Sequence, residues 1–217
     1  MSFINYRASK LVRTFLGSLI LALGLFTSHF AQAEFTLLFL GDSLTIGLGL
    51  EPEESFPSLV EERLIEGGYT DIKVLNAGIS GSTSASGLNR LQWYIRSQPD
   101  LMVLSLGAND GLRGLSTQEM YDNLAKTIEF AQSNGLQVAL TGMQIPPNYG
   151  PEYTSAFKQV FPDLAEKYQL DFLPFLLENV AAIPELNQAD GIHPNTEGAI
   201  IVADTVYSFV QPLLPKR

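Results

Sequence analysis

The sequence contains no cysteine among its 217 residues. Disulfide bonds, thiol nucleophiles and thiolate metal sites are therefore excluded. Histidine is almost as scarce, because the chain carries only His29 and His193. His29 falls in a leader segment that we expect to be removed, which leaves one imidazole in the mature protein. A site with two histidine ligands is then impossible, and any reaction that needs an imidazole base must use His193.

Basic residues are the next scarce class. The whole chain has 13 lysines and arginines against 23 aspartates and glutamates, which gives a formal charge of −10. Three of the basic residues, Arg7, Lys10 and Arg13, lie in the leader, where the sequence has no acidic residue. The remainder therefore carries ten basic residues against 23 acidic ones, formally −13. Such a surface repels phosphate backbones and anionic membranes, and no basic cluster offsets it, so we expect no nucleic-acid partner.

The leader itself has the pattern of a secretory signal peptide. Its basic residues precede an apolar run at 15–26, and the segment ends in Ala-Gln-Ala at 31–33, the small-x-small pattern of a cleavage site. A membrane anchor or a buried helix is the alternative, but the run is short for a membrane span. We predict that residues 1–33 are a signal peptide and that residues 34–217 form a single exported domain, periplasmic or secreted. We expect no stable membrane insertion after cleavage, and the sequence leaves the oligomeric state open.

Residues 34–217 alternate apolar runs with amphipathic stretches. Continuous apolar runs, typical of strands buried on both faces of a parallel sheet, occur at 35–41, 72–78, 100–107, 136–143 and, more weakly, 171–175. Helical patterns lie between them, near 56–64, 88–95, 116–135, 153–168 and from 196 to just before Pro212. Ser116 and Asn195 are expected to cap the third and the last of these helices. The alternation predicts a three-layer α/β/α sandwich whose ligand site lies at the carboxyl edge of the sheet.

The stretch LLFLGDSLTIG at 37–47 places Ser43 directly after the first predicted strand. A strand–turn–helix junction exposes a side chain and directs helix N–H groups towards it. For an isolated Gly-Asp-Ser, the simpler interpretation is that Asp42 or Ser43 caps a short helix. Ser43 is a candidate nucleophile only if another residue accepts its proton.

The sequence ADGIHPN at 189–195 supplies such a partner. It contains His193, three residues after Asp190, so the aspartate can reach back to the imidazole ring. A carboxylate in that position fixes the tautomer of the base and stabilises the imidazolium that forms. Taken alone, His193 could equally be a surface residue whose proximity to Asp190 is accidental.

Three groups are candidates for an oxyanion hole, which must direct several donors at the charge of a tetrahedral intermediate. Gly81 offers a backbone N–H without a side chain in the way, and Asn109 offers a side-chain amide. The N–H of Ser43 would be the third donor. Gly81 and Asn109 could also be ordinary turn residues, since both types are common in turns.

Four blocks along the chain resemble, in the same order, those of the GDSL, or SGNH, hydrolases. They are GDSL at 41–44, Gly81 within NAGISGSTS, Asn109 within LGANDGLRG, and DGIHPN at 190–195. The resemblance is to the bacterial multifunctional thioesterase I, lysophospholipase and arylesterase group, and it covers essentially all of residues 34–217. It implies a flavodoxin-like fold with five parallel strands in the order 2-1-3-4-5. Two departures from that group, Gly78 where serine is expected and Ser82 where aspartate is usual, concern the rim of the pocket.

The same resemblance implies the roles of the candidate residues. Ser43 would be the nucleophile, His193 the base and Asp190 its carboxylate partner, with Ser43, Gly81 and Asn109 forming the oxyanion hole. The expected activity is that of a serine esterase acting on aryl and short- to medium-chain acyl esters through an acyl-enzyme. Lysophospholipase or thioesterase activity and carbohydrate O-deacetylation are the alternatives, and a non-catalytic ligand-binding protein is a weaker one. The expected partner is a small ester or a single-chain lipid.

Motifs for other chemistries are missing from the sequence. It has no G-x-S-x-G elbow and no Walker-type GK[ST], and GLGLEP at 47–52 begins like a dinucleotide loop but ends in proline. Asp42, Asp110 and Asp190 could suggest a metal cluster. They follow separate strands and lack a second histidine, so we expect no metal and no cofactor.

Overall fold

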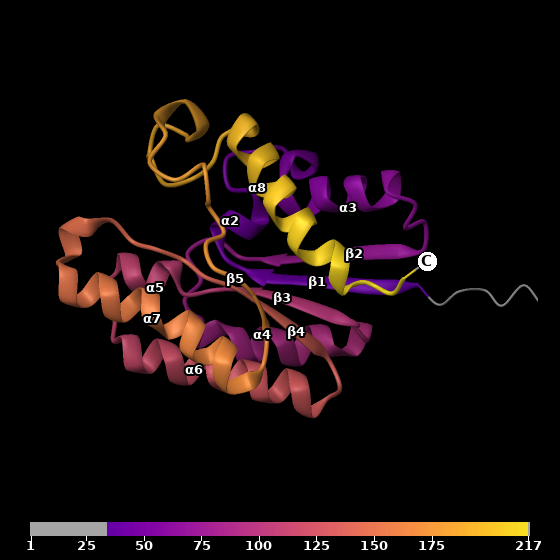
Figure 1. The fold of residues 1–217 in the computed structure, drawn as a ribbon, viewed down its shortest axis with the longest axis horizontal. Helices are drawn as coiled ribbons and strands as arrows, with labels where there is room; N and C mark the ends of the chain where they lie inside the picture. The colour runs from indigo at the N-terminus through magenta and orange to yellow at the C-terminus, as the bar shows by residue number, and fades with distance from the viewer. Residues whose placement is uncertain (1–33, 217) are drawn as a thin grey trace, which may run out of the picture. The chain divides into compact units, whose positions relative to one another are not determined.

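The computed structural model describes residues 34–216, which contain a five-stranded parallel sheet (Figure 1). The strands are β1 (Phe35–Gly41), β2 (Ile72–Gly78), β3 (Leu101–Ser105), β4 (Gln137–Thr141) and β5 (Asp171–Leu173). Their order across the sheet is β2-β1-β3-β4-β5, as the resemblance implied. The predicted signal peptide, residues 1–33, lies outside the described residues.

The register of the sheet aligns three strand ends at one edge. Gly41, the last residue of β1, is paired with Gly78 of β2 on one side and with Ser105 of β3 on the other. The segments that follow these three residues therefore begin side by side at the carboxyl edge, where parallel α/β sheets bind ligands.

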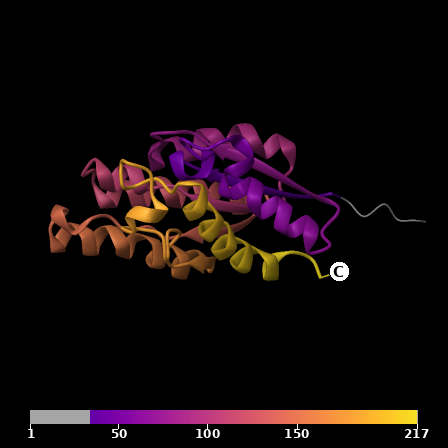
Figure 2. The ribbon, with the colours of Figure 1, turned by 90° about the horizontal axis from the view of Figure 1, so that it is seen from above.

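Helices cover both faces of the sheet. They are α2 (Ser43–Ile46), α3 (Phe56–Glu66), α4 (Gly87–Tyr94), α5 (Ala108–Leu112), α6 (Thr117–Ser133), α7 (Pro151–Tyr168) and α8 (Thr196–Val210). Helices α3 and α8 pack together on one face, whereas α4, α6 and α7 lie on the other (Figures 1 and 2). The predicted three-layer α/β/α sandwich is confirmed. Among the described residues, no helix has both the length and the apolar character needed to cross a membrane.

The predicted helix caps are present. The Glu119 N–H donates to Ser116 Oγ at 3.2 Å, and the Gly198 N–H donates to Asn195 Oδ1 at 3.0 Å. Each bond satisfies one of the backbone donors that a helix leaves unpaired at its start. Helix α7 begins two residues earlier than predicted, at Pro151, because the first helical position needs no N–H donor.

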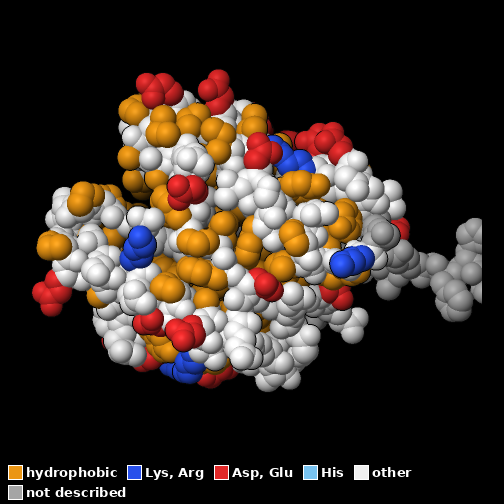
Figure 3. Space-filling view, in the orientation of Figure 1, with side chains coloured by type: hydrophobic (Ala, Val, Ile, Leu, Met, Phe, Trp, Pro, Cys, Tyr) orange, Lys and Arg blue, Asp and Glu red, His pale blue; other side chains and the backbone are white. Residues whose placement is uncertain are grey.

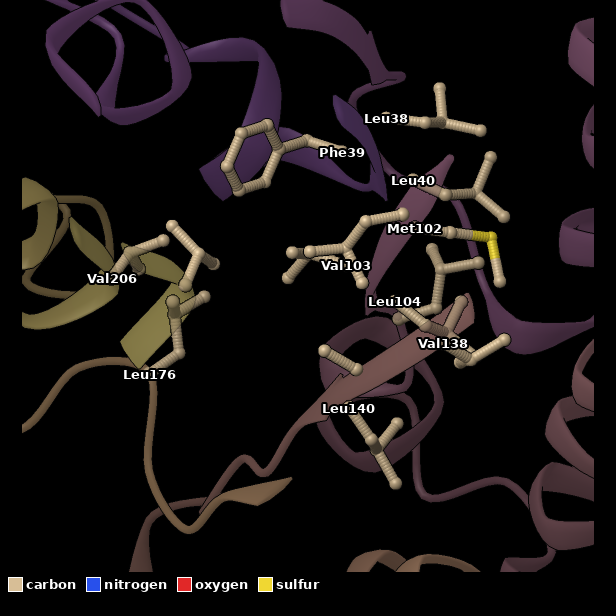
Figure 4. Packing of buried hydrophobic residues seen from close by; sticks show 14 of the residues in the cluster. Leu38, Phe39, Leu40, Met102, Val103, Leu104, Val138, Leu140, Leu176 and Val206 are labelled. Atoms are coloured by element: carbon tan, nitrogen blue, oxygen red, sulfur yellow. The ribbon is translucent and has the colours of Figure 1, made fainter. Parts of the chain in front are cut away.

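The core is formed by side chains that alternate between the two faces of the central strands. Figure 4 shows Phe39 and Val103 directed towards Val206 of α8, whereas Leu38 and Leu40 point to the opposite face. All five of these side chains are completely buried. Because both faces of β1 are apolar and covered, the position of its carboxyl end is fixed by packing on both sides.

Helix α4 departs from its predicted pattern. The apolar spacing of this segment included Trp93, yet Trp93 is 62% exposed, and the buried positions are Gly87, Arg90 and Leu91. These three residues share one helix face through i, i+3 and i+4 spacing. The helix therefore directs a guanidinium, rather than the indole, towards the sheet.

Candidate active site

Ser43 is the first residue of α2 and lies directly beyond the end of β1. Asp42 caps this helix, because the Leu44 N–H donates to Asp42 Oδ1 at 3.0 Å. The turn is tight at Gly41, where an added Cβ would lie 1.9 Å from Thr45 Oγ1. Only glycine fits that approach, so the packing of Gly41 against α2 sets the position of Ser43, which is 8% exposed.

The structure brings Ser43, His193 and Asp190 together, although Ser43 and His193 are 150 residues apart in the sequence. Ser43 Oγ lies 2.8 Å from His193 Nε2, and His193 Nδ1 lies 2.7 Å from Asp190 Oδ2. Both distances are within hydrogen-bonding range. A hydroxyl, an imidazole and a carboxylate that are hydrogen-bonded in this order form the arrangement in which the imidazole can accept the hydroxyl proton.

Asp190 also shapes the loop that carries the imidazole. Its Oδ1 accepts hydrogen bonds from the N–H groups of Ile192 at 3.0 Å and His193 at 3.1 Å, which leaves Oδ2 for the imidazole ring. Burial opposes ionisation of this carboxyl, but the two backbone bonds and the contact with the ring outweigh it and lower the pKa of Asp190 below its usual value. The carboxylate is therefore ionised at neutral pH.

Gln188 ties the His193 loop to the Ser43 side of the site. Its N–H donates to the His193 carbonyl at 2.8 Å. Its side-chain Nε2 donates to the carbonyls of Leu48 at 2.7 Å and Pro194 at 2.9 Å. Because Leu48 follows α2 and Pro194 follows His193, this one amide links the segments on either side of the Ser43–His193 contact.

Asn109 lies in α5, just beyond the end of β3. Its Nδ2 donates to Asp42 Oδ2 at 3.3 Å, so the two carboxylate oxygens of Asp42 hold the Ser43 turn and the Asn109 amide respectively. Asp42 is only 1% exposed. Burial raises the pKa of Asp42 to about 6, although the Leu44 N–H, the Asn109 amide and the charge of His193 act in the opposite direction.

Gly81 lies in the loop after β2 and has a φ of 74°, in the left-handed region that favours glycine. Its carbonyl accepts a hydrogen bond from Arg113 Nη2 at 2.7 Å, and Arg113 directly follows α5. The loop is held a few residues later by Asp110, which accepts from Ser84 N–H at 2.8 Å and from Ser84 Oγ at 2.6 Å. Gly81 is thus anchored by the segment that also carries Asn109.

The three aspartates that suggested a metal cluster serve different parts of the structure. Asp42 caps α2, Asp110 holds Ser84, and Asp190 contacts His193. Within residues 34–216, no three histidine or acidic side chains are grouped as metal ligands would be.

A groove of about 330 Å³ opens at the candidate site. Its lining includes Ser43, Asn109 and His193 together with apolar residues from the segments 143–147 and 175–182. Figure 3 shows apolar side chains spread over the face of the protein that it draws, with acidic and basic side chains among them and around the edge. The groove can therefore hold an apolar group against the Ser43 hydroxyl.

Sequence reasoning missed several parts of this site. The second wall of the groove, at 175–182, follows the weakest predicted strand, and its apolar composition was the only available signal. Nothing in the sequence indicated the contact between Asp42 and Asn109 or the hydrogen bonds of Gln188. Asp, Asn and Gln are common in loops, so their presence does not predict a particular contact.

Comparison with known proteins places these residues in a family context. The family model for the GDSL-like lipase/acylhydrolase family matches residues 39–200. An arylesterase of Vibrio mimicus is 42% identical over 177 residues, which cover 81% of this chain and 88% of the relative. The thioesterase 1/protease 1/lysophospholipase L1 of Escherichia coli K12 is 36% identical over 185 residues, covering 85% and 87% of the two chains. The crystal structure of TesA superimposes with a TM-score of 0.79 at 42% identity, covering 82% of this chain and 99% of that chain.

Proposed function

This chain belongs to the GDSL-like lipase/acylhydrolase family, and we propose that it is a serine esterase that hydrolyses aryl and short- to medium-chain acyl esters. The observation that carries this proposal is the connected set of Ser43, His193 and Asp190, at 2.8 and 2.7 Å. A serine hydroxyl is a weak nucleophile until a base accepts its proton, and this arrangement supplies the base.

In the proposed reaction, His193 Nε2 accepts the proton of Ser43 as Ser43 Oγ attacks the carbonyl carbon of the ester. The charge that develops on the carbonyl oxygen is stabilised by the N–H groups of Ser43 and Gly81 and by the Asn109 amide. When the intermediate collapses, the imidazolium protonates the departing alcohol and the acyl group remains on Ser43. Water then attacks this acyl-enzyme with His193 again as base, which releases the acid and restores the serine. Asp190, whose pKa is lowered, stays ionised and stabilises the imidazolium.

The proposed substrate class follows from the groove. Its volume of about 330 Å³ is at the lower end of the roughly 300–1,000 Å³ that is usual for small-molecule sites. Its walls are mainly apolar, and the net negative charge of residues 34–217 disfavours anionic substrates. A short or medium acyl chain with an uncharged alcohol fits both features.

Lysophospholipase or thioesterase activity is the second candidate, because the Escherichia coli relative carries both names. A single-chain lipid presents the same acyl group to the groove, so this activity needs no further site. An acyl thioester carried on a phosphate-bearing cofactor fits less well, since a formal charge of −13 on residues 34–217 repels phosphates. Carbohydrate O-deacetylation is the third candidate.

We also propose that the protein acts after export, with residues 1–33 as its signal peptide.

The proposal is tested with p-nitrophenyl acetate, butyrate, octanoate and palmitate, and with lysophosphatidylcholine, using purified residues 34–217 and Ser43→Ala. We expect turnover to be highest with the short and medium esters and to fall with palmitate. The Ser43→Ala variant should lose at least about 10⁴-fold in kcat, because removing the nucleophile of a triad leaves only binding and the oxyanion hole. It should remain folded.

Two outcomes would contradict parts of this proposal. Near-normal turnover by Ser43→Ala would exclude Ser43 as the nucleophile. Highest turnover with palmitate or with the lysophospholipid would replace the proposed substrate class by the second candidate. Stoichiometric inactivation by an organophosphate, which is absent in Ser43→Ala, distinguishes an enzyme from a non-catalytic ligand-binding protein.

A further inference from the structure

Arg90 is a buried cation that the proposed reaction does not use. It is 9% exposed and lies on the face of α4 that packs against the sheet. Removing a charge from water is costly unless hydrogen bonds or an opposite charge compensate for it. Burial lowers the pKa of Arg90, whereas the nearby charge of Asp42 acts in the opposite direction. The residue is therefore an unfavourable choice for a position where an apolar side chain would pack.

The guanidinium donates to four oxygen atoms, none of which carries a charge. Its Nη1 donates to the carbonyls of Gly41 and of Ala77, the latter at 2.8 Å. Its Nη2 donates to the hydroxyls of Ser82 at 2.6 Å and Ser86 at 2.7 Å. The rigid fork of an arginine is suited to holding several acceptors in one fixed geometry, which a lysine cannot do.

Two of the four acceptors, in Gly41 and Ser82, lie within two residues of candidate catalytic groups. Gly41 is the last residue of β1, two residues before Ser43, and Ala77 is the penultimate residue of β2. Ser82 directly follows Gly81 in the loop after β2. Arg90 thus connects the strand end that carries Ser43 with the loop that carries Gly81.

Arg63 provides a contrast with the same side chain. It is partly exposed, forms an ion pair with Asp204 at 2.7 Å and donates to the Ile200 carbonyl at 3.3 Å, so it links α3 to α8. These contacts lie on helices away from the groove. Arg63 therefore has a carboxylate partner. The guanidinium of Arg90 instead donates hydrogen bonds to backbone carbonyls and serine hydroxyls near the candidate nucleophile.

We propose that Arg90 is a positioning residue that fixes the loop carrying Gly81 against the Ser43 turn, so that the Gly81 N–H points at the oxyanion. This inference rests on the proposed function, since it concerns the same ester hydrolysis. Arg113, which holds the Gly81 carbonyl from the other side, completes the restraint. A loose donor in an oxyanion hole weakens stabilisation of the transition state while substrate binding in the groove is unaffected.

The test compares Arg90→Lys with Arg63→Met, a control that removes the arginine linking α3 to α8. We expect Arg90→Lys to lower kcat about 10-fold or more with KM within about twofold, since small displacements of catalytic groups have effects of this size. Its rate of inactivation by diethyl p-nitrophenyl phosphate should fall by a similar factor. Arg63→Met should lower the unfolding temperature and leave kcat within about twofold.

A second variant keeps the test decisive if Arg90→Lys does not fold. The double variant Ser82→Ala/Ser86→Ala removes two of the four acceptors and leaves the guanidinium in place. It should lower kcat about threefold or more with KM unchanged, in line with the modest worth of individual hydrogen bonds. Unchanged kcat in this variant, or an Arg90→Lys variant that loses only thermal stability, would overturn the positioning role. Failure of the unsubstituted protein to hydrolyse any ester would instead refute the proposed function.

Discussion

The two halves of the candidate triad are built in different ways. Ser43 lies at the end of the central strand β1, where Asp42 is 1% exposed and Gly41 fits closely against α2. His193 and Asp190 lie in the irregular loop at 187–195, just before α8, and the Asp190 side chain is 45% exposed. The hydroxyl is thus positioned by the core, whereas the imidazole is positioned by hydrogen bonds within and across a surface loop.

This difference predicts two kinds of mutational effect. Substitutions in the packed region that surrounds Ser43 should change the free energy of unfolding as well as activity. Substitutions in the His193 loop remove a few exposed hydrogen bonds from a segment with little buried apolar surface, so they should change activity with little effect on global stability.

The largest effect is expected for Asp190→Asn in the loop. The amide oxygen of the introduced side chain can still accept from the N–H groups of Ile192 and His193, which preserves the loop. The amide nitrogen would donate to His193 Nδ1 and so place the ring proton on Nε2, where the ring cannot accept the proton of Ser43. We expect kcat to fall roughly 10²–10³-fold, somewhat less than in a fully buried triad, with only a small fall in the unfolding temperature, since the lowered pKa of Asp190 shows a modest stabilising contact.

Asp163→Asn is the control, because Asp163 is an exposed aspartate on α7 whose carboxylate accepts from Gln159, far from the triad in the chain. Its kcat should stay within about twofold of the unsubstituted protein. An Asp190→Asn variant with nearly full kcat would show that the carboxylate does not set the tautomer of His193. A large drop in its unfolding temperature would contradict the assignment of this loop to local hydrogen bonding.

The next prediction concerns the effect of Asp42, which lies beside Ser43 in the packed part of the site, on stability. Its pKa of about 6 in the folded protein is above the ordinary value of 3.8, so the native state binds a proton more readily than the unfolded state does. The ionised carboxylate therefore destabilises the fold, fully above about pH 6, and this destabilisation is removed as the pH falls from about 6 to the ordinary pKa of 3.8. We expect the stability of Asp42→Asn relative to the unsubstituted protein to rise by on the order of 2–3 kcal/mol between about pH 4 and about pH 8.

The same substitution should lower activity. Without the carboxylate, the Asn109 amide loses its fixed acceptor and can turn its oxygen towards the substrate. We expect kcat to fall about 10-fold, which is less than the loss on removing an oxyanion donor entirely. Urea unfolding at the two pH values, with Asp163→Asn as the reference, measures the stability effect. A pH-independent stability difference would refute the raised pKa of Asp42.

The fold followed closely from the apolar pattern, and the departures have a common cause. Strands β3 and β4 end before the predicted limits of 107 and 143, because the chain turns out of the sheet at Gly107 and Gly142. Gly107 has a φ of 118°, and a Cβ on Gly142 would lie 2.3 Å from the Pro174 carbonyl oxygen. Hydrophobicity alone does not distinguish an apolar residue within a buried strand from one, such as Met143, that lies beyond the strand and lines the groove.

Some contacts within the site could be predicted from the sequence, and others could not. Ser43, His193 and Asp190 could be predicted to meet because residues 34–217 contain only one histidine, and an aspartate lies three residues before it. The buried position of Arg90 could not be predicted, since the apolar pattern of α4 indicated Trp93 as a packing residue. Whether a charged or an apolar side chain faces the sheet depends on which acceptors the neighbouring strand ends and loop provide, and those are set by the tertiary fold.

The smallest effect is expected for Gln188→Ala, which loosens the loop without touching the triad. The substitution removes the bonds from Nε2 to the carbonyls of Leu48 and Pro194, but the backbone bond from Gln188 to His193 remains. We expect kcat to fall about fivefold with KM within about twofold, because the imidazole would sample positions away from Ser43 Oγ. Gln132→Ala is the matched control, since its amide donates to the Tyr168 carbonyl far from the groove. If Gln188→Ala kept full kcat, backbone pairing of Asn187 with Pro194 would suffice to place the base, and the loop would be more rigid than its exposure indicates.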